Sequence, residues 1–123
     1  MQLGAVIVYV EDVGAAVDFY WRAFGLEPGA VTGDEYFELQ AGSRTVLAFA
    51  ARSFIEKQMP GHGKPPEGFE LALVADDVQA AFDRAVGAGA EPVKEPAEMP
   101  WGQVVSYVRA PDGTLVELCS EWR

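Results

Sequence analysis

Two segments of the chain repeat their apolar residues at the spacing of an amphipathic helix. The two apolar stripes consist of Val13, Val17, Tyr20 and Phe24, and of Val78, Phe82 and Ala85. A short apolar segment precedes each stripe, at residues 5–10 and 69–75, and both have the length and composition of a β-strand. Three shorter strands are predicted after each helix. The pattern therefore predicts the element order βαβββ, twice.

Start and stop signals frame both predicted helices, near residues 13–24 and 77–88. Asp12 and Asp77 stand where a short carboxylate can accept hydrogen bonds from the free N–H groups of a first helical turn. Gly25 and Gly89 stand where a glycine can terminate the helix.

An internal repeat relates the two halves of the chain. A shift of 65 positions superposes Asp12 on Asp77 and Asp18 on Asp83. After a one-residue deletion, the sequence GLEP at 25–28 falls on GAEP at 89–92. We predict a single domain spanning residues 1–123, with modules at about 1–56 and 68–123 and a linker rich in Pro and Gly at 57–67.

Alternation along the predicted strands sorts their side chains into two faces. One face is almost wholly large and apolar and is predicted to pack on the helices: Val6, Val8, Val10, Phe37, Leu39, Leu47, Phe49, Phe69, Leu71, Leu73, Val116 and Leu118. The other mixes small, aromatic and acidic residues, as a cavity lining does: Ala5, Ile7, Tyr9, Tyr36, Glu38, Gln40, Val46, Ala48, Ala50, Glu70, Ala72, Val74, Leu115, Glu117 and Cys119. We expect Val104 and Ser106 to join this lining, from a strand that ends at a tight turn over residues 110–114.

Composition narrows the function classes. The formal net charge of −10 argues against nucleic acid as a partner, because a phosphate binder needs a basic surface. No apolar run approaches the ~20 residues that span a bilayer, and the N-terminus lacks the pattern of a signal peptide. The single cysteine, Cys119, excludes an intramolecular disulfide and suits a reducing compartment. We expect a cytoplasmic protein that does not bind membranes.

Glu70 and Glu117 are lone carboxylates on otherwise apolar strands, and both fall on the predicted cavity face. Each either reaches water near a strand end or lines a pocket. In a pocket, a desolvated carboxylate must be neutralised, hydrogen-bonded or paired, because leaving it bare costs several kcal/mol.

Three stretches resemble the vicinal oxygen chelate superfamily, which includes glyoxalase I, extradiol dioxygenases, fosfomycin-modifying thiol transferases and bleomycin resistance proteins. They read VIVYVEDVGAAVDFYWRAFGLEP, GFELALVADDVQAAFDRAVGAGAEPV and PWGQVVSYVRAPDGTLVELCS. The resemblance implies an α+β fold of tandem βαβββ modules, which form an open eight-stranded curved sheet around a pocket. It also implies a homodimer in which both chains build each site.

In the metal-dependent members of that superfamily, four side chains on the first and last strands of the modules hold the ion. Carried over by position, these places are Ala5, Ala48, Glu70 and Glu117. Alanine offers no lone pair, and two carboxylates without imidazole are a poor site for zinc or iron. A harder ion such as Mg²⁺ or Mn²⁺ tolerates oxygen ligands, and Glu38 could supply a third carboxylate. We therefore expect no cofactor, with a divalent metal as the alternative; His62, in the linker, is not an expected ligand.

The metal-free branch of the superfamily binds and sequesters drugs, which makes drug binding and antibiotic resistance of the bleomycin-resistance type the leading interpretation. The expected ligand is a cationic or aromatic small molecule held at the dimer interface. The candidate binding residues are Tyr9, Tyr36 and Trp101 as aromatic walls, with Glu38, Glu70 and Glu117 to neutralise a cation. We interpret Trp21 as a core or dimer contact and Trp122 as part of a subunit interface.

Two enzymatic alternatives stay open. One is a divalent-metal glyoxalase-like lyase, or a related isomerase, that uses Glu70 and Glu117. The other is a metal-free enzyme in which one glutamate of raised pKa is a general base. No catalytic residue can be assigned from the pattern.

Overall fold

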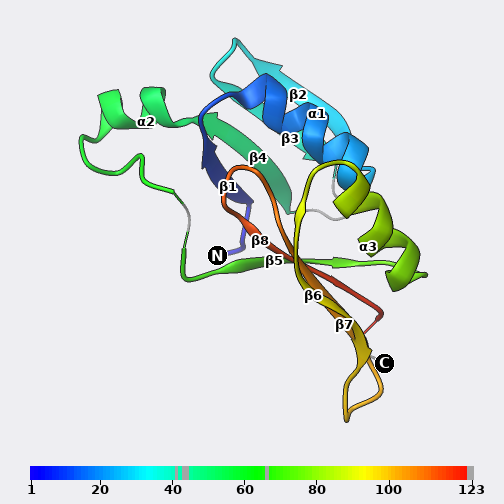
Figure 1. Ribbon diagram of the computed structural model, residues 1–123. Coiled ribbons are helices and arrows are strands. Elements are labelled where there is room, and N and C mark those ends of the chain that lie inside the picture. The colour runs from blue at the N-terminus through cyan, green and yellow to red at the C-terminus, as the bar shows by residue number, and fades with distance from the viewer. Residues whose placement is uncertain (41, 43–44, 66, 122–123) are drawn as a thin grey trace. The chain divides into compact units, whose positions relative to one another are not determined.

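The computed structural model describes residues 1–40, 42, 45–65 and 67–121, and its eight strands form two mixed sheets of four (Figure 1). The first half contains β1 (Ala5–Val10), α1 (Val13–Phe24), β2 (Glu27–Thr32), β3 (Tyr36–Gln40), β4 (Val46–Ala51) and α2 (Arg52–Gln58). The second half contains β5 (Glu70–Val74), α3 (Val78–Gly87), β6 (Glu91–Glu98), β7 (Val104–Arg109) and β8 (Leu115–Cys119).

The chain divides into two compact units. Unit 1 comprises Met1–Trp21 and Gly25–Pro66, and unit 2 comprises Arg22–Phe24 and Glu67–Arg123. The strand orders are β1-β4-β3-β2 and β5-β8-β7-β6, so the two sheets share one topology. In each, the first and last strands of a βαβββ module pair in parallel. The predicted α+β fold of tandem modules is therefore confirmed, whereas the prediction that both modules form one domain stays a prediction.

The predicted caps Asp12, Asp77 and Gly25 are confirmed, whereas α3 has its C-cap at Ala88, one residue before the predicted Gly89. Asp12 accepts a hydrogen bond at 3.0 Å from the backbone N–H of Ala15, and Asp77 accepts the same bond from Ala80. Gly25 ends α1 at a φ of 69°, in the left-handed region that favours glycine. Within the described part of the chain, no helix combines the length and the apolar character needed to cross a membrane.

The apolar faces of the strands form the core of each unit. In unit 1, the ring of Tyr20 on α1 meets the ring of Phe49 edge to face, with centroids 4.6 Å apart, and Val8 is 1% exposed. In unit 2, α3 contacts β7, β6 and β8, and Val116 is fully buried. On the opposite side of the unit 2 sheet Val74 is 52% exposed, whereas Ala48 in unit 1 and Cys119 in unit 2 are fully buried on that side. The faces are assigned as predicted for these residues, but Phe69, which was expected in the core, is 43% exposed.

The helix α2 was not predicted, and its last two residues lie in the segment interpreted as a linker. It is short and contains no buried residue, and its N-cap Ala51 makes no side-chain hydrogen bond. The sequence therefore shows neither the apolar periodicity nor the capping residue that usually predicts a helix. Arg52 anchors its start by donating to the backbone oxygen of Tyr9 at 3.2 Å and by pairing with Glu11 at 3.2 Å. It follows β4 directly and has no counterpart after β8 in the described residues.

Candidate functional site

Glu70 and Glu117 lie on the open face of the unit 2 sheet, which we define as the face turned away from α3. In the parallel β5–β8 ladder, Glu70 stands opposite Leu115, and Glu117 stands opposite Ala72. The carboxylates therefore occupy diagonal positions on adjacent strands. Glu70 is exposed and Glu117 is half-buried. Alternation thus predicts their common face correctly.

Tyr107 is a third member of this site that the sequence did not reveal. It stands opposite Glu117 in the antiparallel β7–β8 ladder, and its phenol donates a hydrogen bond of 2.8 Å to Glu117 Oε1. The prediction that Val104 and Ser106 join the lining is wrong. Ser106 pairs with Leu118, is fully buried, and donates its hydroxyl to the Leu118 carbonyl oxygen at 2.9 Å.

The register that places Tyr107 could have been read from the turn. Ala110 donates its N–H to the carbonyl oxygen of Thr114 at 2.9 Å, which closes the turn between β7 and β8. Stepping outward by three residues on each strand reaches Tyr107 and Glu117 together. The position of the turn is therefore the sequence signal for this pairing.

Electrostatics tie Glu70, Glu117 and Tyr107 into one cluster. Burial raises the pKa of Glu70 above its ordinary value, and the nearby charge of Glu117 raises it further. The pKa of Tyr107 is raised to about 12, first by its hydrogen bond to Glu117 and then by burial. Tyr107 therefore remains a hydrogen-bond donor at neutral pH. The two carboxylates together form an electronegative patch that a cation would stabilise.

Cys119 lies at the buried end of the same strand and is suited to packing rather than to nucleophilic attack. It is fully buried, and its thiol donates to the Leu73 carbonyl oxygen at 3.8 Å. Burial and the neighbouring Glu117 raise its pKa to about 11. A thiol held neutral in this way is a poor nucleophile.

The open face of the unit 1 sheet gathers Tyr9, Tyr36 and Glu38. Glu38 stands opposite Ala48, and Tyr36 and Tyr9 flank Ala50 on the two neighbouring strands. The phenol of Tyr36 donates to Glu38 Oε2 at 2.8 Å, and burial, followed by that bond, raises the phenol pKa. Three of the predicted binding residues thus share one face.

The repeat makes the two open faces comparable position by position. Glu38 opposite Ala48 in unit 1 occupies the register of Tyr107 opposite Glu117 in unit 2. Each cross-strand pair therefore contains one carboxylate. It lies on the third strand of unit 1 and on the fourth strand of unit 2.

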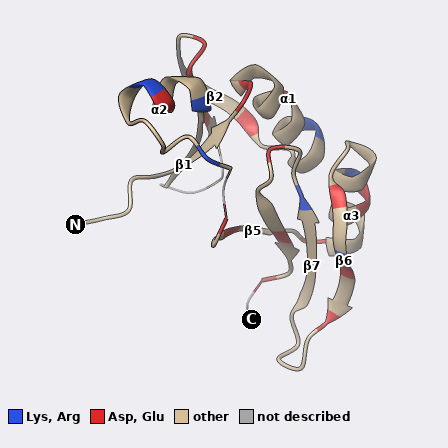
Figure 2. Cartoon of the chain, turned by 60° about the vertical axis from the view of Figure 1, so that its left-hand side comes forward, with Lys and Arg blue, Asp and Glu red and all other residues tan. Residues whose placement is uncertain are grey.

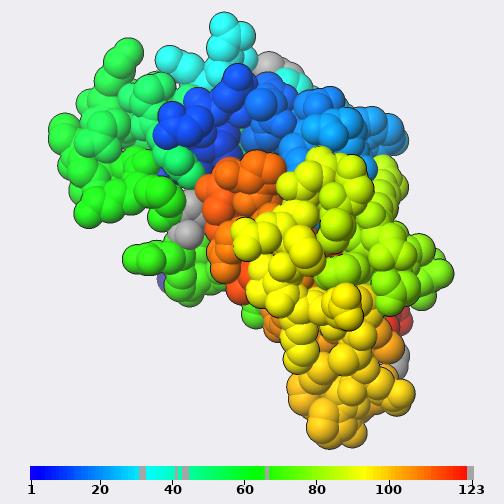
Figure 3. Space-filling view, viewed as in Figure 1, coloured from blue at the N-terminus to red at the C-terminus, as the bar shows by residue number. Residues whose placement is uncertain are grey.

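Trp101 lies in the loop between β6 and β7, a hairpin that forms one end of unit 2 (Figure 3). Its side chain is 64% exposed, and its indole N–H donates to Gln103 Oε1 at 2.8 Å. Gln103 is buried and in turn donates to the Ser120 carbonyl oxygen at 2.9 Å. From Gln103 to Tyr107 the strand rises about 13 Å, so the indole is held at the hairpin end rather than over Glu117.

The remaining two tryptophans are Trp21 and Trp122. Trp21 is 44% exposed on α1, so the interpretation as a core residue is wrong. Trp122 lies outside the described residues.

Two of the four metal positions of the superfamily lack a donor atom in this chain. Ala5 and Ala48 share the open face of unit 1, in the register that Glu70 and Glu117 have in unit 2, and neither alanine has a donor atom. His62 is exposed in the loop after α2, with Nδ1 3.2 Å from the Met59 carbonyl oxygen. Among the described residues, no group of three or more His, Cys, Asp or Glu side chains is arranged to hold a metal ion.

Charged residues of both signs surround the unit 2 site. The chain has 19 acidic and 9 basic residues, and Figure 2 shows acidic positions along β5 and β6. Glu91, Glu95 and Glu98 are all exposed on β6. Lys94 stands opposite Tyr107, and Arg109 stands opposite Leu115, so the open face also carries two basic residues. The net charge of −10, rather than the immediate surroundings of the site, favours the approach of cations over anions.

The family model for the Glyoxalase/Bleomycin resistance protein/Dioxygenase superfamily matches residues 2–118. A glyoxalase-related enzyme from Fulvimarina pelagi is 23% identical, with a TM-score of 0.86 over 98% of this chain and 88% of its own. A family enzyme from Burkholderia phytofirmans PsJN is 21% identical, with a TM-score of 0.83 over 98% of both chains. A superfamily member from Sphaerobacter thermophilus is 25% identical, with a TM-score of 0.76 over 98% of both. A search of curated protein sequences found no match.

Proposed function

Because the chain belongs to the Glyoxalase/Bleomycin resistance protein/Dioxygenase superfamily, we propose that it is a small-molecule-binding protein of the bleomycin-resistance type. It binds without metal and sequesters a cationic or aromatic ligand in a pocket at the interface of a homodimer. The proposal that no metal takes part is supported by Ala5 and Ala48, which stand where a metal-dependent member needs donors.

The pairing of Glu70 with Glu117 is the observation that carries this proposal. Burial and mutual repulsion leave the Glu70 carboxylate poorly stabilised when it is ionised, as its raised pKa indicates. A bound cation relieves both effects at once. Tyr107 occupies one oxygen of Glu117 and orients the carboxylate, so the cation meets a fixed partner.

The flat part of the ligand stacks on aromatic side chains. Tyr9 and Tyr36 supply rings on the open face of unit 1, where Glu38 adds a carboxylate, and Trp101 supplies an exposed indole. Each cation–aromatic contact contributes about 0.5–2 kcal/mol, depending on how far the cation is desolvated.

A second copy of the chain is part of the proposal because each sheet ends in outer strands that are hydrogen-bonded to a neighbour on one side only. The outer strands are β1 and β2 in one sheet and β5 and β6 in the other. Natural proteins cover or pair such edges, and a dimer does so while closing a pocket over an open face.

A lyase or isomerase that holds a divalent metal at Glu70 and Glu117 is the second candidate. The approach of the two carboxylates favours it, and the two alanines disfavour it. A metal-free enzyme is a third candidate. Glu70 would be its general base, a role that the raised pKa of Glu70 favours.

A thermal-shift titration with three matched compounds tests the leading proposal: naphthylmethylammonium, neutral naphthylmethanol and anionic naphthoate. We expect the cation to raise the melting temperature most. A larger shift with naphthoate would contradict an acidic pocket. Turnover of glyoxalase-type substrates by metal-loaded protein, lost in Glu117→Gln, would favour the lyase instead.

A further inference from the structure

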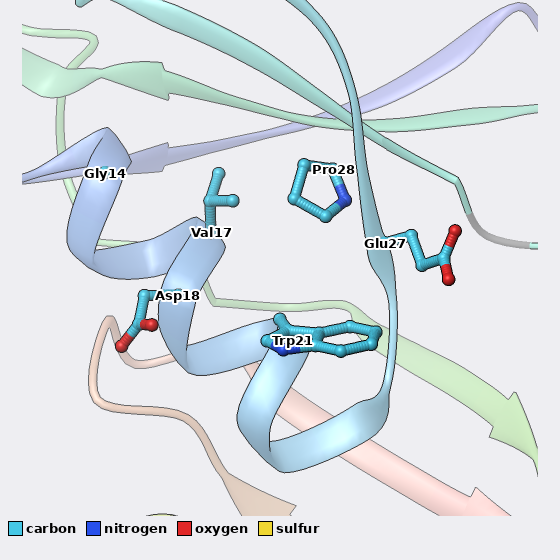
Figure 4. A pocket seen from close by; sticks show the side chains of 6 residues that line it. All are labelled: Gly14, Val17, Asp18, Trp21, Glu27 and Pro28. Carbon is cyan, nitrogen blue, oxygen red and sulfur yellow. The ribbon is translucent and has the colours of Figure 1, made fainter.

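A slot lies between α1 and β2 in unit 1, outside the open face of the sheet. It encloses about 460 Å³ and is lined by Gly14, Val17, Asp18, Trp21, Glu27 and Pro28. In Figure 4 the indole of Trp21 lies between the helix and the strand, and Val17 and Pro28 lie to one side of it. The volume is within the roughly 300–1,000 Å³ of small-molecule pockets.

The chemistry of the lining selects a type of guest. The centre of the slot is apolar and aromatic, with the Trp21 side chain 44% exposed. Asp18 and Glu27 carry carboxylates on opposite flanks, and both point outward from the slot toward its rim (Figure 4); none of the six lining residues is basic. A flat apolar body can stack on the indole while a positive charge lies near a carboxylate.

The internal repeat explains why the slot is open in unit 1. Of the six lining positions, unit 2 retains three as Asp83, Glu91 and Pro92. The other three differ: Gln79 replaces Gly14, Phe82 replaces Val17 and Val86 replaces Trp21. In unit 2, the Gln79 amide extends along the helix and donates to Asp83 Oδ1 at 3.0 Å.

Gly14 leaves that space free at some cost to the helix, because glycine is a poor helix former. A Cβ at Gly14 would meet only Asp12 Oδ1 within 4 Å, at an ordinary 3.5 Å, so packing does not require the glycine. Gly14 and Trp21 are therefore the two of these three differences that we connect with the accessible aromatic surface on α1, since Val17 and Phe82 are both buried.

We propose that this slot is a second binding site, for a small organic cation with a planar apolar body. Trp21 provides the stacking surface, Glu27 and Asp18 provide the negative potential, and Gly14 provides the opening. This site is separate from the Glu70 cluster, and its occupancy does not depend on the function proposed for that cluster.

The test uses naphthylmethylammonium and the indole N–H resonances of the intact ¹⁵N-labelled chain, assigned with Trp21→Phe, Trp101→Phe and Trp122→Phe. We expect saturable movement of the Trp21 resonance. Gly14→Gln copies unit 2 and should weaken that binding about tenfold or more, because its side chain displaces several ligand atoms. It should not lower the melting temperature, because glutamine is the better helix former. Gly14→Ala adds only a methyl group and should change affinity far less.

Charge and site controls complete the design. Glu27→Gln should weaken binding about two- to fivefold, the size of an exposed ion pair. Glu91→Gln removes the same charge at the equivalent place in unit 2 and should have no effect. Glu70→Gln should also leave the Trp21 response intact.

Three outcomes would overturn the site. The first is a Trp21 response that Gly14→Gln leaves unchanged. The second is a stronger response to naphthoate than to the cation. The third is movement of the Trp21 resonance with protein concentration alone, which would assign the slot to a second copy of the chain.

Discussion

The phenol of Tyr107 and the carboxylate of Glu117 face each other across the β7–β8 ladder and are joined by a 2.8 Å hydrogen bond. The bond, together with burial and the nearby negative charges, raises the pKa of Tyr107 to about 12, and it fixes one oxygen of Glu117. Glu70, on the next strand, is then the carboxylate of the pair that is left to meet a ligand or the solvent.

Tyr107→Phe should abolish one tyrosine ionisation in an alkaline titration followed by ultraviolet absorbance. In the parent chain this step lies near pH 12, because the bonded phenol keeps its proton. The stability from this raised pKa is complete below pH ~10 and is lost as pH rises toward 12. At neutral pH the variant should lose about 0.5–1.5 kcal/mol of unfolding free energy in urea. Tyr9→Phe is the control, and a step near pH 12 that survives in Tyr107→Phe would assign it to another residue.

Glu70→Gln should keep the fold and selectively weaken cations. The raised pKa of Glu70 means that its ionised form is disfavoured in the folded state, so its unfavourable contribution to stability appears as pH rises above about 4.5. Neutralising it should leave the unfolding free energy at pH 7 equal or higher. Affinity for naphthylmethylammonium should fall about two- to fivefold by calorimetry. Glu95→Gln, an exposed change on β6, should do neither, and unchanged cation affinity in Glu70→Gln would make Glu70 an ordinary exposed carboxylate.

Trp101→Ala should weaken those aromatic guests that are long enough to reach from Glu117 to the hairpin end. Cationic and neutral guests of that length should be weakened alike, because stacking does not depend on charge. A lost aromatic contact of about 0.5–1.5 kcal/mol corresponds to roughly two- to twelvefold in affinity. Val93→Ala, which truncates an exposed residue of the same hairpin, is the control. Equal affinities in parent and Trp101→Ala would remove Trp101 from the binding site.

Protein purified without a chelator should contain no stoichiometric zinc, iron or nickel. Ala5 and Ala48 leave two of the four superfamily ligand positions without a donor, and two carboxylates are a poor site for these ions. Elemental analysis and melting curves with and without a chelator measure this. One equivalent of tightly bound transition metal, with a melting temperature that a chelator lowers, would favour the lyase.

The chain should form a two-fold homodimer that buries at least roughly 1,000 Å² in total. Light scattering at micromolar concentration measures the mass. A monomer under these conditions would argue against any pocket built from two chains.

The parts of the fold that follow from short-range rules could be predicted from the sequence. Asp12 and Asp77 act on N–H groups three residues away, and strand alternation depends on the pleat alone, so caps and faces are readable locally. The helix α2 could not be predicted in this way, because contacts of Arg52 with β1 and the following loop hold it rather than an apolar stripe.

The same distinction applies to the candidate sites. Glu70 and Glu117 stand out as single charges on apolar strands, whereas Tyr107 becomes relevant only through its cross-strand partner. The slot at Gly14 is harder still to predict, because it depends on the absence of a side chain at position 14. A glycine within a helix does not usually indicate a binding site. In the sequence, the alignment of Gly14 with Gln79 in the internal repeat is the feature that points to the slot.

The register that places Glu38 opposite Ala48 constrains how this chain could change. Restoring an acidic ligand at position 48 would set two negative charges directly across the ladder, where like charges repel. Position 48 is also fully buried, so the new carboxylate would be desolvated as well. A gain of a metal ligand there must therefore be accompanied by replacement of Glu38, for instance by the tyrosine that unit 2 carries at the equivalent place. Laboratory-evolved variants that gain a metal at this site should change these two positions together.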